Sequence, residues 1–203
     1  MAYIYQDRVT CLIWTYNPNI NLLRKVIQSV NKTADHIVIV DNGSSNVSEI
    51  RKLAKKKPHI HCLFLKYNSG VHALNVGIDY IISFLKPKYI LVLDQDSTLV
   101  QETQVQYVLK TFDTLLSRQK KIAAIFLNDH DESYERSLLE ITHPRRFSGM
   151  IIHSDVIIRE NMRIREDFFL DQADFDLFST LKGKGYKLLT TGMKLINHKV
   201  GIS

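Results

Sequence analysis

The chain has 203 residues, of which 45% are hydrophobic and 24% are charged. This is the composition of one ordinary globular domain, and it excludes a disordered protein. No apolar run approaches the roughly 20 residues of a membrane-spanning helix. The net charge of +6 is compatible with phosphorylated ligands or an anionic membrane surface. Basic and aromatic residues do not interleave as they do in RNA-binding domains, so we expect no nucleic-acid partner.

The start of the chain and its two cysteines bear on cellular location. Asp7 and Arg8 precede the apolar run VTCLIW, which is too short for a signal peptide. Cys11 and Cys62 each lie in an apolar run and form no CxxC pair, so we expect buried, reduced thiols. These features favour a cytoplasmic protein.

The first hundred residues alternate between apolar runs of strand character and segments of helical periodicity. In chain order, the predicted elements are a strand at Val9–Trp14, a helix from Ile20, a strand at His36–Asp41, a helix at Val47–Lys57, a strand at Ile60–Leu65, a helix from Val71 and a strand at Tyr89–Leu93. Strands of continuous Val, Ile and Leu are typical of a parallel sheet that helices cover on both faces. The sequence therefore predicts a doubly wound α/β fold.

Each of these four strands is followed by a polar segment. The segments are Thr15-Tyr16-Asn17, Asp41-Asn42-Gly43-Ser44, Asn68-Ser69-Gly70 and Asp94-Gln95-Asp96. In open α/β sheets, ligands bind beyond the carboxyl ends of the strands. Four polar segments at one edge therefore predict a binding site there.

The second half of the chain is less regular. Its predicted elements, in order, are a helix at Gln101–Arg118, a strand at Ile122–Leu127, a long polar loop at Asn128–Arg145, a strand at Phe147–His153, a short helix capped by Ser154, and a helix that ends at Gly183 or Gly185 and leads into a strand. The last helix is rich in acids at its start, in the sequence FFLDQADFDLFSTLKGKGYKLL.

Two chemistries compete for the carboxylates of Asp94 and Asp96. They can hold Mg²⁺ or Mn²⁺, which neutralises a diphosphate leaving group. Alternatively, Asp94 is a nucleophile and Asp96 a general acid, as in haloacid-dehalogenase-like phosphatases. The stretch ILVLDQDST resembles the first motif of that family. Those phosphatases usually open their core fold with this motif, whereas here three strand–helix units precede it.

A series of motifs resembles the family 2 glycosyltransferases of the GT-A fold. VTCLIWTYN, IVIVDNGS, NSGVHALNVGI and ILVLDQDS resemble the nucleotide-sugar-binding half, and SGMII, FFLDQADFDL and NHKVG resemble acceptor-side motifs. The form DQDS is most similar to bacterial rhamnosyltransferase-like members that build cell-surface polysaccharides. The resemblance covers nearly the whole chain. It implies one GT-A domain at 1–203, with a nucleotide-sugar half at 1–100 and an acceptor half at 101–203.

The resemblance also implies a donor site. Thr15, Tyr16 and Asn17 would shape the nucleotide pocket, and Asp41 would hydrogen-bond a pyrimidine base. The residues implied to line the nucleotide or the sugar are Asn68, Gly70, Asn75, Asp94, Gln95, Ser148 and Gly149. Gly70 would permit a close backbone approach.

The metal ligands implied by the resemblance are Asp94, Asp96 and His198, the last from a terminal His-x-x-Gly motif. The implied ion is Mn²⁺ or Mg²⁺, and a neutral imidazole suits Mn²⁺ better.

Asp174 resembles the catalytic base of the family. General-base assistance to the attacking hydroxyl contributes about 10²- to 10⁴-fold, and direct attack inverts the anomeric centre. Asp171 and Asp176 are rival candidates for this role. The three carboxylates cannot all face one point, because side chains two residues apart on a helix diverge. This chain has Ala173-Asp174 where many members have an acidic pair.

The implied function is transfer from a UDP- or dTDP-sugar to a glycan or lipid-linked acceptor at the cytoplasmic membrane face, where the net charge is compatible with peripheral attachment. Arg145 and Arg146 are candidates to meet the diphosphate or an anionic acceptor. A catalytically silent nucleotide-sugar-binding module is a further alternative, and the oligomeric state stays open. Many family members continue beyond the His-x-x-Gly motif, so a further acceptor- or membrane-binding segment is an expectation.

Overall fold

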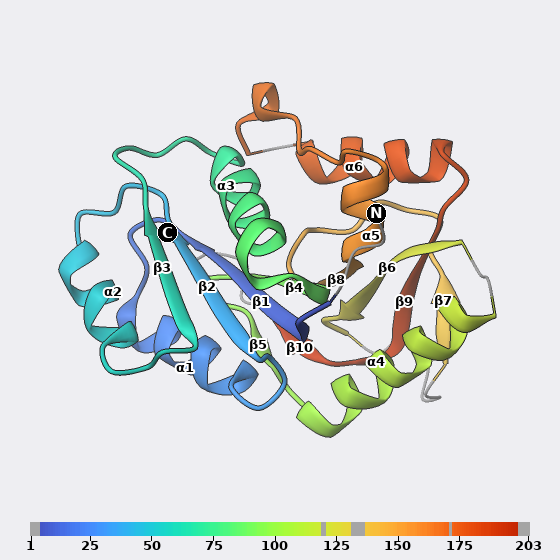
Figure 1. Ribbon diagram of the computed structural model, residues 1–203, viewed down its shortest axis with the longest axis horizontal. Helices are drawn as coiled ribbons and strands as arrows, with labels where there is room; N and C mark the ends of the chain where they lie inside the picture. Colours follow the sequence, from blue (N-terminus) through green and yellow to red (C-terminus); the bar gives the residue numbers. More distant parts are fainter. Residues whose placement is uncertain (1–4, 119–120, 131–136, 171, 199–203) are drawn as a thin grey trace.

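The computed structural model describes residues 5–118, 121–130, 137–170 and 172–198. An eight-stranded sheet in the order β3-β2-β1-β4-β8-β6-β9-β7 forms its centre (Figure 1). The strands are β1 (Asp7–Thr15), β2 (His36–Asp41), β3 (Ile60–Phe64), β4 (Pro87–Asp94), β6 (Ile122–Asn128), β7 (Leu138–Glu140), β8 (Met150–His153) and β9 (Lys187–Lys194). Strands β1 to β4 are parallel, whereas β8 and β7 run antiparallel to their neighbours. The predicted α/β sheet is therefore confirmed.

Helices cover both faces of the sheet (Figure 1). One face packs against α1 (Ile20–Val30), α2 (Val47–Ala54) and α4 (Glu102–Ser117), and the other against α3 (His72–Tyr80), the π-helical turn η1 (Ile81–Leu85), α5 (Ser154–Arg159) and α6 (Ala173–Gly183). Side chains of a strand alternate between the two cores: Cys11 and Ile13 enter the first, and Leu12 enters the second. None of the helices in the described ranges combines the length and apolar character needed to cross a bilayer.

The predicted elements of the first half all form, with small shifts at their ends. The helix expected to reach Lys57 ends at Ala54, and the helix expected from Val71 begins at His72. Cys11 is buried as expected, whereas Cys62 is only half-buried, and neither forms a disulfide.

Three expectations for the second half were wrong. The stretch expected to be a loop contains the edge strand β7, which gains backbone hydrogen bonds from β9, although residues 131–136 lie outside the described ranges. The strand expected from Phe147 begins at Met150, because the chain turns at Gly149 with a φ of +89°. Ser154 does not cap α5: it is the first residue inside the helix, and its buried Oγ has no hydrogen-bond partner in the described part of the chain.

A second, two-stranded sheet was not predicted. β5 (Thr98–Leu99) pairs antiparallel with β10 (Ile196–Asn197), so that Leu99 lies opposite Ile196. Strands of two residues carry no periodicity that a sequence pattern can reveal. The pairing joins the segment after β4 to the segment after β9 and so connects the two halves of the chain.

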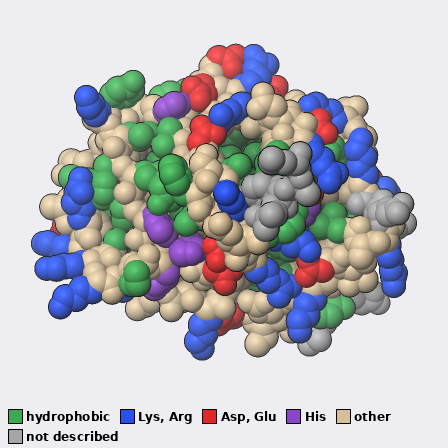
Figure 2. Space-filling view, viewed as in Figure 1, with side chains coloured by type: hydrophobic (Ala, Val, Ile, Leu, Met, Phe, Trp, Pro, Cys, Tyr) green, Lys and Arg blue, Asp and Glu red, His purple; other side chains and the backbone are tan. Residues whose placement is uncertain are grey.

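The surface charge is dispersed on the face shown in Figure 2. Lys and Arg side chains are spread around the rim and are interspersed with Asp and Glu. The net charge of +6 is therefore not concentrated in one patch on this face.

Gly149 supports the small sheet, and its replacement tests this. A Cβ at this position would lie 2.9 Å from the Leu127 carbonyl oxygen and 2.9 Å from Ile196 Cδ1, and φ is positive. We predict that Gly149→Ala lowers the free energy of unfolding by about 2 kcal/mol or more. Urea unfolding would measure the loss. Gly183→Ala is the matched control, because its Cβ meets nothing within 4 Å; it should be neutral or stabilising by up to about 1 kcal/mol. Equal effects of the two variants would contradict the prediction.

Candidate functional site

The carboxyl ends of the parallel strands open into a cleft of about 580 Å³. Its lining residues are Trp14, Thr15, Tyr16, Asn42, Asn68, Asp94, Gln95, Asp96, Leu170 and His198. All four polar segments that follow the first four strands therefore contribute at least one side chain. The convergence expected from the sequence is found in the structure.

Asp94 is fixed at the end of β4 by groups from two neighbouring segments. Trp14 Nε1 donates a hydrogen bond to Asp94 Oδ1 at 2.7 Å, and the Asp94 backbone N–H donates to Ser148 Oγ at 3.1 Å. Burial raises the pKa of Asp94, against the opposing effects of the Trp14 hydrogen bond and the nearby His198. The carboxylate of Asp96 raises this pKa further, and Arg146 lowers it. The surroundings of Asp94 therefore disfavour the charged form of its carboxylate.

His198 reaches this carboxylate through the pairing of β5 with β10. Because Asn197 lies opposite Thr98, the next residue falls beside Ser97, and His198 Nδ1 lies 2.7 Å from Ser97 Oγ. The same nitrogen lies 3.7 Å from Asp94 Oδ2.

A buried pair of serines connects these groups. Ser148 Oγ donates to Ser97 Oγ at 2.8 Å, and Ser97 is fully buried. One continuous hydrogen-bonded series therefore runs from the Asp94 backbone through both hydroxyls to the imidazole of His198.

Asp94, Asp96 and His198 have the arrangement of a metal-binding group. One potential ligand atom from each lies within 4.8 Å of the others, and this is the one such group in the described ranges. Two carboxylates and an imidazole are suitable ligands for Mn²⁺, and the carboxylates also for Mg²⁺. The residues present therefore fit a divalent cation.

Thr15, Tyr16 and Gln95 line the cleft, and the Tyr16 backbone N–H donates to Gln95 Oε1 at 2.8 Å. Asp41 has a different position. Its carboxylate is buried, accepting from Thr15 Oγ1 at 3.2 Å and from the Ser44 backbone at 3.1 Å. Asn17 likewise serves the neighbouring loop, since its Oδ1 accepts from the backbone of Ser45 at 2.8 Å. In this structure both side chains hold the loops behind the cleft.

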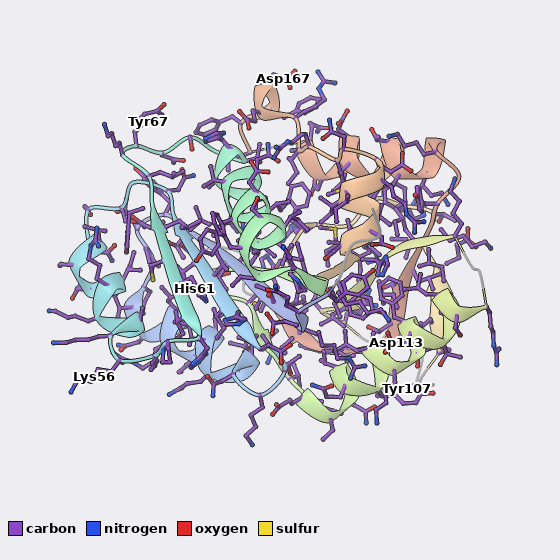
Figure 3. The ribbon with its side chains drawn as sticks, viewed as in Figure 1. Lys56, His61, Tyr67, Tyr107, Asp113 and Asp167 are labelled. Atoms are coloured by element: carbon purple, nitrogen blue, oxygen red, sulfur yellow. The ribbon has the colours of Figure 1, made fainter. Side chains whose placement is uncertain are left out.

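Asn42 holds the loop that follows β3. Its Nδ2 donates to Asn68 Oδ1 at 2.9 Å and to the Gly70 carbonyl at 3.0 Å. Gly70 has a φ of +59°, and an added Cβ would collide with the carbonyl of Phe169. Gly70 thus permits a close backbone approach, in this case of the chain's own segment. Figure 3 shows Tyr67, on this loop, and Asp167 at the same end of the molecule.

Asn75 does not line the cleft but clamps this segment to α3. Its Nδ2 donates to the Ile164 carbonyl and to Glu166 Oε1, both at 2.8 Å, and its Oδ1 accepts from the Ile164 N–H at 3.0 Å. His72 Nδ1 also contacts Glu166 Oε1 at 2.8 Å, and the Asn75 and His72 hydrogen bonds keep the pKa of Glu166 below its ordinary value. The clamped residues Ile164 and Glu166 belong to the segment that continues to Leu170, which lines the cleft.

Two of the three candidate bases, Asp174 and Asp176, lie in the first turn of α6. Asp174 is half-buried and accepts a hydrogen bond from the Phe175 backbone at 2.9 Å; among the described residues, it does not belong to the cleft lining. Asp176 forms an ion pair with Arg165 at 3.4 Å. Asp171 lies outside the described residues.

Three contributors to the site were missed by sequence reasoning. Trp14 was treated as the last residue of a buried strand, although a Trp N–H requires an acceptor and so signals a polar neighbour. Ser97 and Leu170 carry no such signal. Ser148 and Gly149 were predicted beside the donor sugar; in the structure Ser148 supports Asp94, and Gly149 packs against Ile196.

Comparisons with known proteins agree on a family. Residues 10–116 match the model of Glycosyl transferase family 2, and this range includes Asp94 with the three strand–helix units before it, which argues against the phosphatase alternative. The dTDP-rhamnosyl transferase RfbF of Shigella flexneri is 28% identical over 187 residues, covering 83% of this chain and 61% of that protein.

A solved structure shares the fold. The crystal structure of TarS 1–349 from S. aureus matches with a TM-score of 0.64 and 15% identity, over 93% of this chain and 59% of that one. This match confirms the GT-A fold expected from the sequence, and at this identity it concerns the fold alone. The chain spans about 60% of the length of both relatives.

The clamp at Asn75 can be tested by a double-mutant cycle. Asn75→Asp removes both donated hydrogen bonds and opposes two carboxylates, so we predict a loss of about 1–3 kcal/mol in the free energy of unfolding. Glu166→Gln supplies a new amide donor opposite the introduced carboxylate and should restore about 1 kcal/mol in that background. Urea unfolding of the wild type, both single variants and the double variant measures this coupling. Strictly additive losses would contradict the clamp.

Proposed function

The chain belongs to glycosyl transferase family 2, and we propose that it is a metal-dependent, inverting transferase that uses a UDP- or dTDP-sugar. The observation that carries the proposal is the convergence of Asp94, Asp96 and His198 in a cleft built from the polar ends of four parallel strands. This placement combines ligands for a cation with room for a nucleotide at the edge of the sheet where α/β folds bind ligands.

The metal-binding residues would be Asp94, Asp96 and His198, with Mn²⁺ or Mg²⁺ as the ion. When bound, the cation supplies positive charge that neutralises the diphosphate leaving group. The protein orients these ligands through Trp14, which holds one Asp94 oxygen, and Ser97, which contacts the imidazole. Fixing ligands through outer hydrogen bonds in this way is typical of protein metal sites.

The base that accepts the proton of the acceptor hydroxyl is proposed to be Asp174. Asp174 lies in the first turn of α6, where the helix dipole favours a negatively charged side chain. Direct attack by the acceptor oxygen on the anomeric carbon then inverts that centre. Asp171 and Asp176 are the alternatives within the same stretch.

The identity of the nucleotide and of the acceptor completes the proposal. The name of the relative RfbF supports a dTDP-linked donor, with UDP as the alternative. We propose a glycan or lipid-linked acceptor in cell-surface polysaccharide synthesis, reached from the cytoplasmic side of the membrane. One observation favours a silent nucleotide-sugar-binding module as the second candidate: Asp174 is not among the described residues that line the cleft.

A thermal-shift panel tests the donor site. We predict that UDP or dTDP raises the melting temperature of the full chain by several degrees only when Mn²⁺ or Mg²⁺ is present, because a ligand of the native state stabilises it. Asp96→Asn should weaken this metal-dependent binding at least tenfold. Asp167→Asn, which removes an exposed acid that is paired with Arg165 and does not line the cleft, is the control and should bind like the wild type. Metal-independent shifts, or equal binding by both variants, would argue against the proposal.

The proposed base is tested by release of the nucleoside diphosphate from the donor in the presence of an acceptor glycan. Asp174→Asn should retain donor binding and lose about 10²-fold or more in release rate. Asp176→Asn is the matched control and should stay close to the wild-type rate, because that side chain is occupied by Arg165. Full activity of Asp174→Asn would move the base to Asp171 or Asp176. Donor binding without release by the wild type would favour the silent module.

A further inference from the structure

A second cavity of about 350 Å³ adjoins the cleft on the other side of His198. The carboxyl end of β6, the segment at 144–148, and residues from β9 and β10 form it. Its lining residues are Phe126, Leu127, Asn128, Asp129, His130, Pro144, Arg145, Arg146, Ser148, Thr190, Ile196 and His198. His198 is the lining residue that the two spaces share, so a ligand here would lie next to the proposed metal site.

Asn128 provides an unused hydrogen-bond donor in this cavity. The residue is 3% exposed, and its Nδ2 has no hydrogen-bond partner in the described ranges. Its backbone is fixed on both sides: the N–H donates to Thr191 Oγ1 at 2.9 Å, and the carbonyl accepts from Leu195 at 2.8 Å. A buried donor without a partner costs about 1–3 kcal/mol, and such groups are rare in native proteins. An acceptor atom supplied by a ligand would satisfy it.

The charged side chains of the cavity favour an anion. Arg145 and Arg146 both line it, and guanidinium groups bind the oxygens of phosphates and carboxylates in pairs. Among the described residues that line the cavity, Asp129 is the one acid, and its Oδ1 lies 2.7 Å from His130 Nδ1.

We propose that this cavity is a second anion subsite, which binds an oxyanion of the acceptor through Asn128, Arg145 and Arg146. The inference rests on the proposed function, in which the cluster of Asp94, Asp96 and His198 accounts for the donor diphosphate. A separate donor-rich cavity beside that cluster then suits a different anion. The acceptor would therefore carry a phosphoryl or carboxylate group close to the hydroxyl that attacks.

The test titrates the full chain with inorganic phosphate in the presence of saturating dTDP and Mg²⁺, followed by amide NMR. The side-chain amide of Asn128 should shift on addition of phosphate, whereas that of Asn75, which is saturated by its own hydrogen bonds, should not. Methyl phosphate and glucuronate, added separately, distinguish a phosphorylated acceptor from an acidic sugar. Binding of either supports the subsite.

Charge-removing variants make the test specific. Arg145→Gln and Arg146→Gln should each weaken phosphate binding about tenfold. Lys187→Gln removes one positive charge from an exposed Lys at the start of β9 and should leave phosphate binding unchanged. Binding of the nucleotide with its metal, measured without phosphate, tests the proposed function. Binding of phosphate tests the anion subsite, so either hypothesis can fail without the other.

Two results would overturn the subsite. A phosphate-induced shift at Asn128 that appears only when dTDP is left out would assign the arginines to the donor diphosphate. No shift at Asn128 with any of the three anions would mean that the cavity binds no oxyanion.

Discussion

The four residue positions of β5 and β10 hold the candidate site together. Their antiparallel register sets Asn197 opposite Thr98 and so delivers His198 to Ser97, 101 residues away in the chain. Gly149 allows this packing, because any side chain there would press on Ile196. Without the pairing, the acids after β4 would remain but the imidazole would have no defined place. A site built from both halves of the chain therefore depends on a very small sheet.

A second tether holds the segment that supplies Leu170 to the lining of the cleft. Asn75 binds the backbone of Ile164 in both directions, and the Val71 N–H donates to the Phe169 carbonyl at 2.6 Å. Both tethers fasten an irregular segment to a regular element by hydrogen bonds that require one particular partner. Such contacts stabilise one loop conformation more than they add to overall stability. The sheet and helices thus supply rigidity, while a few polar groups position the loops that bind ligand.

How far the sequence predicts this structure depends on the range of each interaction. The strands and helices of the first half follow from local periodicity, and the polar turns at their ends follow from the geometry of parallel sheets. The contact between Trp14 and Asp94 joins residues on neighbouring strands, so only their pairing register reveals it. Asn75 illustrates a different difficulty. Its place in a motif was visible in the sequence, but its role depends on Ile164 and Glu166, which no local pattern connects to it.

The two spaces on either side of His198 share an energetic property. Folding brings Asp94 into a half-buried place beside Asp96, where its pKa is raised although Trp14 donates to it. Folding also buries the Asn128 amide without a partner in the described ranges. A chain selected for stability alone would satisfy or remove such groups, because each is costly in a low-dielectric interior. A cation beside Asp94 would neutralise its carboxylate, and an anion beside Asn128 would accept the unused hydrogen bond of its amide. The fold thus leaves a carboxylate that favours a cation next to an amide donor that favours an anion, as expected where two reactants must meet.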